Sequence, residues 1–196
     1  MKPDRDTAAH TRFAPAERAD HDEIQRTVRA VADHPLVHAT LEAFDGLVLV
    51  LNAKRQLVAV NESVLARLGF DTREQTLGLR PGELLGCIHA GGAPGGCGTC
   101  DACRSCGATT SVLDSAARQE TVRAPCLLSF ERDGQVDSLE LEAKATPFVV
   151  EDEQLTLLSL RDVSDTRRRE QLERVFLHDL AGTVSVGAIV FGLLSG

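Results

Sequence analysis

The chain of 196 residues contains no tryptophan and no tyrosine, and aromatic residues make up only 4% of it. The core must therefore be built from Leu, Val and Ala, and a flavin held between aromatic rings is not expected. The hydrophobic fraction of 43% is that of an ordinary soluble protein. A chain of this length can bury a core without covalent cross-links, so we expect one modest domain with helical extensions.

Positive charge is also scarce, because 21 Lys and Arg residues against 29 Asp and Glu residues give a net charge of -8. Such a chain is poorly suited to a phosphate backbone, so nucleic acid is not an expected partner. The longest apolar stretch, 184–194, is shorter than the roughly 20 residues that span a bilayer, so we expect no membrane span. The first residues are charged and lack the apolar segment of a secretory signal, which favours a cytoplasmic location.

Cysteine, by contrast, is concentrated in one short segment. Five of the six cysteines fall within the glycine-rich residues 86–107. They are Cys87, Cys97, Cys100, Cys103 and Cys106. Thiols stay reduced in the cytoplasm, which favours metal ligation over structural disulfides. Thiolates at two-residue intervals on a glycine-rich backbone can converge on one metal ion or cluster.

Three interpretations of this segment stay open. The repeated two-residue spacing from Cys97 to Cys106 resembles the iron–sulfur run of ferredoxins, which however has three residues before its last cysteine. A tetrahedral zinc site would take Cys87, Cys97, Cys103 and Cys106, and the same four thiolates could hold a cluster, which we place first. Cys100 is then the alternative ligand. The third interpretation is a metal-free thiol switch, in which cysteine pairs oxidise to disulfides.

Two further residues, His89 and Cys126, could also belong to this site. His89 lies two positions after Cys87 and is a weak candidate ligand for a metal. Cys126 falls on the inward face of an expected strand together with Val122 and Leu128, so we interpret it as a buried apolar residue outside the site.

The rest of the chain is rich in strand patterns after a helical start. Residues 15–33 place Ile24, Val28 and Val31 on one helical face. Apolar runs at 47–51 and 56–60 predict a hairpin. Short helices are expected after Asn61 and after Asp71, since both residue types cap helix starts, and a longer helix at 111–117. Alternating patterns predict three more strands, at 122–130, 139–145 and 154–160.

This order of elements resembles a PAS domain, a sensory fold in which five strands form one curved sheet and helices wall off a ligand pocket. Residues 45–53 resemble the first PAS strand, 57–70 the second strand with its helix, and 160–166 the segment that couples the last strand to an output helix. The resemblance covers about residues 41–165. It implies an α+β fold with a single five-stranded antiparallel sheet and short helices, in which residues 86–107 occupy the most variable region.

The predicted C-terminal helix carries an apolar stripe suited to pairing with a second copy of the chain. Residues 173–183 resemble the phosphoacceptor helix of sensor histidine kinases. That resemblance implies that His178 is phosphorylated and that Asp179 orients its imidazole. Gly182 stands where related proteins commonly carry Thr or Asn, so a phosphatase activity is not implied.

We therefore divide the chain into four parts. These are a disordered tail at 1–13, an N-terminal helix at 14–40, a PAS-like sensor domain at 41–165 and a long signalling and phosphoacceptor-like helix at 166–196, a truncated bundle. The expected partners are a second copy of the chain through both terminal helices, a kinase ATP-binding domain in cis or in trans, and a response regulator. No ATP-binding domain is recognisable, so enzymatic activity stays undecided, and the resemblance implies that the chain is part of a sensor histidine kinase.

The sequence thus predicts a cytoplasmic signal-transduction sensor. In this interpretation a metal-thiolate centre, iron–sulfur or zinc, senses redox state or a gas and controls histidine kinase output through His178. An interpretation from a different class is a non-catalytic scaffold or dimerisation module, in which zinc only stabilises the fold. The thiol-based redox switch remains the third.

Overall fold

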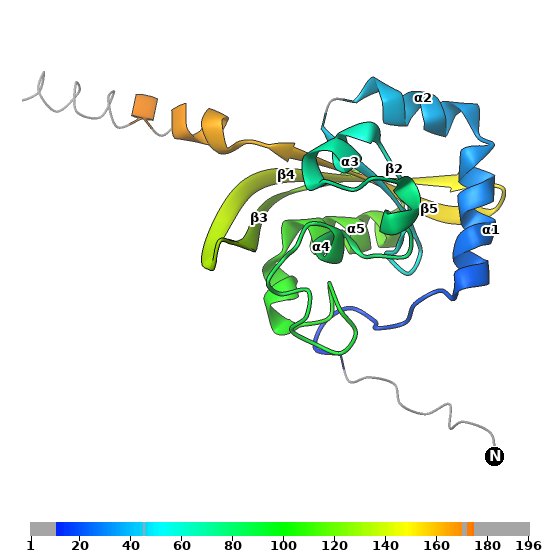
Figure 1. Cartoon of the computed structure of the whole chain (residues 1–196), viewed down its shortest axis with the longest axis horizontal. Coiled ribbons are helices and arrows are strands. Elements are labelled where there is room, and N and C mark those ends of the chain that lie inside the picture. The colour runs from blue at the N-terminus through cyan, green and yellow to red at the C-terminus, as the bar shows by residue number, and fades with distance from the viewer. Residues whose placement is uncertain (1–10, 45, 170–171, 175–196) are drawn as a thin grey trace, which may run out of the picture. The chain divides into compact units, whose positions relative to one another are not determined.

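In the computed structural model, which describes residues 11–44, 46–169 and 172–174, one sheet of five antiparallel strands forms the centre (Figure 1). The strands lie in the order β2-β1-β5-β4-β3. Their bounds are β1 Leu47–Asn52, β2 Leu57–Val60, β3 Val122–Arg132, β4 Gln135–Val150 and β5 Glu153–Asp162. The predicted α+β class and five-stranded antiparallel sheet are confirmed, including the hairpin of β1 and β2.

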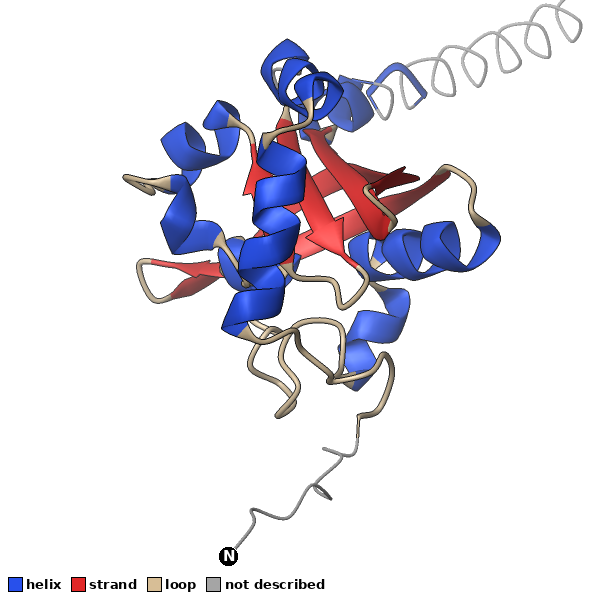
Figure 2. Cartoon of the chain, turned by 90° about the vertical axis from the view of Figure 1, so that its right-hand side faces the viewer, coloured by secondary structure: helices blue, strands red, loops and turns tan. Residues whose placement is uncertain are grey.

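Helices lie on both faces of the sheet (Figure 2). The helices are α1 His21–Ala32, α2 Pro35–Ala43, α3 Glu62–Leu68, α4 Pro81–Leu84 and α5 Gly107–Arg118, with short 3-10 turns η1 Arg73–Thr76 and η2 Asp101–Ser105. Helices α3, α4 and α5 contribute to the hydrophobic cluster on the inner face, and α1 and α2 to the cluster on the outer face.

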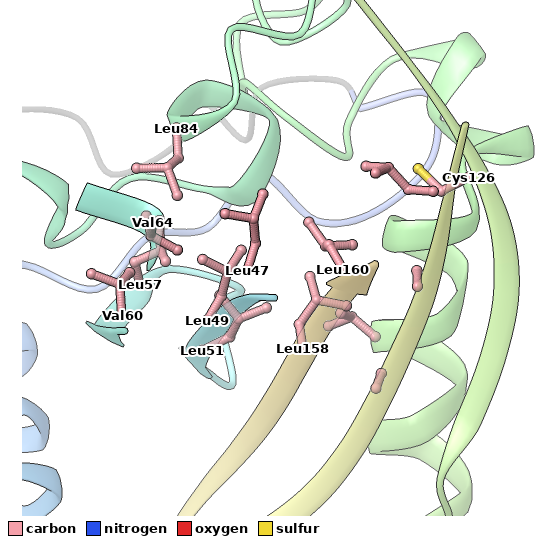
Figure 3. Close-up of a cluster of buried hydrophobic side chains, with 14 of the residues drawn as sticks. Leu47, Leu49, Leu51, Leu57, Val60, Val64, Leu84, Cys126, Leu158 and Leu160 are labelled. Atoms are coloured by element: carbon pink, nitrogen blue, oxygen red, sulfur yellow. The ribbon is translucent and has the colours of Figure 1, made fainter. Parts of the chain in front are cut away.

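Strand β1 is buried along its whole length because both of its faces are covered. Leu47, Leu49 and Leu51 join the inner cluster, which Figure 3 shows, whereas Val48 and Val50 join the outer one. A strand buried on both faces needs apolar residues at every position rather than at alternate ones. This explains the continuous apolar run that the sequence has here.

The N-terminal helix predicted over 14–40 is wrong in extent and continuity. Helix α1 begins only at His21, after Asp20, whose side chain accepts a hydrogen bond from the Glu23 amide at 2.9 Å. Pro35 begins a second helix instead of only ending the first, since a proline at the first helical position has no amide left unpaired. Residues 12–19, here called the strap, run without helix along the cysteine segment.

Asn61 occupies the N-cap position of α3, as predicted, but its side chain has a different role from the one expected. Its side chain makes no capping bond. Its Oδ1 instead accepts from the Val48 amide at 3.2 Å, and its Nδ2 donates to the carbonyls of Phe44 at 3.0 Å and Gly46 at 2.8 Å. The side chain is buried, so it satisfies three backbone groups where the chain enters β1.

Residues 164–169 and 172–174 are helical, as predicted for the start of the C-terminal helix. The remainder of that predicted helix, with His178, Asp179 and Gly182, lies outside the described residues, as do residues 1–10 of the predicted tail. No helix in the described ranges has the length and apolar character needed to cross a membrane.

Replacing Asn61 with Ala tests the three hydrogen bonds between its side chain and the backbone. We expect Asn61→Ala to lower the free energy of unfolding by about 2–3 kcal/mol, because buried amide and carbonyl groups lose their partners. Urea unfolding followed by circular dichroism measures this loss. Exposed Glu120→Ala is the control and should change stability by less than about 0.5 kcal/mol. An Asn61→Ala protein as stable as the control would contradict the role given to this side chain.

Candidate metal centre

The cysteine segment, residues 86–107, connects α4 to α5 across the inner side of the sheet. It is built from turns and the short η2 helix rather than from long elements. Gly96 and Gly98 have φ angles of 80° and 89°, in the left-handed region that a residue with a Cβ adopts only under strain. The glycines therefore let the segment fold back on itself and bring distant cysteines together.

A cavity of about 220 Å³ lies between this segment, α5 and the inner face of the sheet. Five thiol side chains line it. They are Cys87, Cys97, Cys103, Cys106 and Cys126. Leu51, Leu141 and Leu160 from the sheet provide apolar lining, while Arg55 and Arg80 bring positive charge to the wall. The cavity thus combines soft sulfur ligands, buried cations and an apolar floor.

Most of the predicted ligand residues lie at the cavity. Cys87, Cys97, Cys103 and Cys106 all line the cavity, and His89 does as well. Cys100 does not line it. Its buried thiol instead points to the carbonyl oxygen of His89, 3.7 Å away.

Cys126 lies at the cavity, although the sequence placed it outside the site. It is buried on the inward face of β3, as predicted, and Figure 3 shows it in the same buried layer as Leu160. Its sulfur lies 4.0 Å from that of Cys106, a residue 20 positions earlier. Alternation correctly predicted the face of the strand, but it could not reveal which loop residue lies opposite.

All six thiols are free, and four of them form two close pairs. Cys106 and Cys126 are one pair, and Cys100 and Cys103 are the other, with their sulfurs 3.0 Å apart. With the side chains as they stand, no three Cys, His, Asp or Glu side chains of the described residues are close enough to hold a metal ion. Coordination would therefore require changes in the cysteine side-chain rotamers.

Gly82 in α4 lies against Cys97 and Cys87, and its lack of a side chain leaves room for both. A methyl group added there would lie 2.7 Å from the Cys97 sulfur and 3.3 Å from the Cys87 Cβ. The Gly82 amide also donates a hydrogen bond to the Cys97 sulfur at 3.2 Å. Backbone amides directed at a thiolate stabilise its negative charge. Close approach of α4 to both cysteines therefore requires glycine.

Arg80 connects the segments that surround the cavity, and it is completely buried. Its guanidinium donates to backbone carbonyl oxygens of the strap and of the cysteine segment. The acceptors are Pro15, Ala16, Glu17, Gly95 and Cys97, at 2.7 to 3.5 Å. Its Nε has no partner. A planar guanidinium with five donors can bridge several carbonyls at once, which a lysine ammonium cannot do in the same way.

The charge around the cavity is unbalanced. Burial lowers the pKa of Arg80 to about 10, with further lowering by Arg55 and Arg18. Burial likewise lowers the pKa of Arg55, whose guanidinium donates to the Pro15 carbonyl at 2.7 Å. Arg18 forms an ion pair with Glu83. Arg55 and Arg80 bond to carbonyl oxygens rather than to carboxylates, so the wall favours an anionic occupant.

The thiols differ in their acidity. Burial raises the pKa of Cys97 to about 12 and that of Cys103 to about 11. A hydrogen bond from Cys126 lowers the pKa of Cys106 to about 5, helped by backbone amides of the first turn of α5. The same hydrogen bond raises the pKa of Cys126. Cys106 directly precedes α5, where a helix start favours a thiolate.

No protein-family model and no curated protein matches the sequence. Among solved structures, the PAS domain of BvgS from Bordetella pertussis is 16% identical, with a TM-score of 0.46, and the match covers 76% of this chain and 96% of that chain. The PAS domain of nitrogen regulation protein NR(II) from Vibrio parahaemolyticus is 16% identical, with a TM-score of 0.40 and coverage of 66% and 99%.

A PAS domain from a two-component sensor histidine kinase is 11% identical, with a TM-score of 0.40 and coverage of 65% of this chain and 93% of that chain. These similarities are too distant to assign a ligand, an activity or a partner to this chain. The three solved structures named here are each described as a PAS domain.

Replacing Arg80 with Met tests whether its guanidinium holds the strap against the cysteine segment. We expect Arg80→Met to lower the free energy of unfolding by about 3–5 kcal/mol, because several buried carbonyls lose a charged donor. Trypsin cleavage after Arg12 or Arg18 should become faster under native conditions. Arg123→Met, at an exposed arginine of β3, is the control. Unchanged stability and unchanged cleavage in Arg80→Met would show that the guanidinium does not fasten the strap.

Proposed function

We propose that this chain is a PAS-type signal-transduction sensor whose input is a metal-thiolate centre held in the five-thiol cavity. The observation that carries the proposal is the gathering of five thiols around one cavity beside two buried guanidiniums. Unrelated cysteines on a globular fold have no physical reason to gather in this way. Four thiolates around a divalent ion carry a net double negative charge, which the guanidiniums of Arg55 and Arg80 offset.

An iron–sulfur cluster suits the spacing of the cysteines and the surroundings of the cavity. Cysteines at short intervals, as in residues 97–106, are typical of sequences that bind iron–sulfur clusters. The Gly82 amide on the Cys97 sulfur is the kind of contact that tunes a cluster's reduction potential. When bound, a cluster supplies a one-electron redox change. Sensitivity to oxygen, nitric oxide or redox poise would then be the signal.

Zinc is the second candidate for the occupant, and one distance favours it. Zinc–sulfur bonds of about 2.3 Å in a tetrahedron place two thiolates about 3.8 Å apart. Cys106 and Cys126 are 4.0 Å apart. With zinc as a permanent occupant, the centre would stabilise the fold as a scaffold or dimerisation module rather than sense a signal. The metal-free thiol switch would instead use Cys100 and Cys103, whose sulfurs are 3.0 Å apart.

The proposed output is a change in helix packing beyond the sheet. Loading, loss or redox change of the centre shifts the cysteine segment and α5 against the inner face of the sheet. The shift passes along β5 into residues 162–166 and changes the pairing of the C-terminal helices in a homodimer. His178 is the proposed phosphoacceptor, with Asp179 orienting its imidazole, an ATP-binding domain in cis or in trans, and a response regulator as the receiver.

Metal and sulfide analysis of the chain purified without oxygen tests the proposal. We expect bound iron with acid-labile sulfide and visible absorbance that changes reversibly with reductant. Colourless protein with one zinc, which unfolds on chelation and shows no reversible change, would instead support the scaffold. Protein that carries neither iron nor zinc, and takes up neither when reconstituted, would overturn the metal-thiolate proposal.

Two glycine variants sharpen this test. Gly82→Ala inserts a methyl group between Cys97 and Cys87 without requiring a left-handed backbone, so we expect about a tenfold or greater loss of bound metal. Gly91→Ala is the matched control, because an added methyl group there meets no atom within 4 Å. Equal metal content in both variants would mean that the thiols beside Gly82 do not hold the metal.

A further inference from the structure

We infer that Cys126, on strand β3, is a ligand of the metal-thiolate centre, in a set of four with Cys87, Cys97 and Cys106, and that Cys100 and Cys103 form a separate dithiol beside it. This inference rests on the proposed function, because it concerns the same cavity. It departs from the ligand set that the sequence favours by exchanging Cys103 for Cys126. The exchange follows from which of the thiols lie close together in space.

Cys106 and Cys126 form the first half of the proposed ligand set. Their sulfurs are 4.0 Å apart, close to the spacing of two thiolates on one metal ion, and both line the cavity. Two different rigid elements support them. Cys126 lies in β3, paired with Leu141 of β4, and Cys106 directly precedes α5. Ligands on strands and at helix starts keep their positions better than ligands within loops.

Cys87 and Cys97 line the same cavity beside α4. Both approach Gly82, where an added methyl group would contact the Cys97 sulfur and the Cys87 Cβ. The backbone of Cys87 forms a β-bridge with Phe130, and the next amide, Ile88, donates to the Ser129 carbonyl at 3.0 Å. Cys87 is therefore fastened to β3, the same strand that carries Cys126.

Cys103 is left out of this set because its thiol is paired with that of Cys100. Its sulfur lies 3.0 Å from that of Cys100, closer than Cys106 lies to Cys126. Cys100 does not line the cavity and points to the His89 carbonyl, so the pair is directed partly away from the cavity. Cys103 would have to leave this contact to bind the metal. Cys126 faces the cavity in the same layer as the apolar floor.

The consequence is that the centre would tie the cysteine segment to the sheet itself. Cys126 belongs to β3, whereas Cys87, Cys97 and Cys106 belong to the segment between α4 and α5, where the backbone of Cys87 is bridged to Phe130 of β3. Metal binding would then cross-link elements that are distant in the sequence. A ligand on the central sheet also gives a changed centre a direct mechanical connection to β3 and its neighbours.

The test compares the metal content of single variants of the whole 196-residue chain, purified side by side without oxygen. We expect Cys126→Ala and Cys106→Ala each to lose about tenfold or more of the bound iron or zinc relative to the unaltered chain. Cys100→Ala and Cys103→Ala should keep it. Circular dichroism and thermal unfolding confirm that each variant is folded, since alanine fills the buried position of Cys126 with a small apolar side chain.

A second measurement needs no variant. Rates of alkylation at each cysteine, read by mass spectrometry with the metal bound and after chelation, should fall on metal binding at Cys87, Cys97, Cys106 and Cys126. The rates at Cys100 and Cys103 should stay the same and act as internal references.

The outcomes are distinct. Metal lost from Cys103→Ala but retained in folded Cys126→Ala, or protection of Cys103 and not of Cys126, would overturn this inference while leaving the metal-thiolate proposal in place. An unaltered chain that binds no metal would overturn the proposed function, and the ligand set with it.

Discussion

The site depends on one buried guanidinium. Arg80 lies just before α4, is inaccessible to solvent, and donates to carbonyls of both the strap and the cysteine segment. Removing a cation from water is costly unless its hydrogen-bonding groups are satisfied, so the surrounding backbone must hold its carbonyls in place. The carbonyls of residues 15–17 all accept from Arg80, and the strap that contains them is not helical.

Burying this cation also sets the electrostatics of the cavity. Arg80 and Arg55 bring positive charge to a wall lined by thiols, while the sheet supplies an apolar floor. Burial penalises both charged groups and lowers the pKa of each guanidinium. The proposed thiolate centre, with its net negative charge, would relieve this penalty, and the arginines would in turn favour the deprotonated cysteines that a metal needs. Buried cations and thiols line the same cavity.

Much of the fold could be predicted from the sequence, because alternation and turn residues act locally. The apolar run at 47–51 and the alternating patterns at 122–130 and 154–160 lie within β1, β3 and β5. The features that the sequence did not predict depend on contacts between distant segments of the chain. Periodicity placed Cys126 facing inward but could not show Cys106 opposite it. The sequence gives no signal for the role of Arg80, since nothing in it shows that five carbonyls converge on this side chain.

The central claim is that sulfur from this cavity binds a metal. Metal K-edge X-ray absorption of the chain purified without oxygen tests it most directly, because the nearest shell reports the identity of the ligand atoms. The account predicts a shell made of sulfur, at about 2.3 Å if the metal is zinc. A nearest shell dominated by nitrogen or oxygen would contradict the account, since the thiols around the cavity would then not be the ligands.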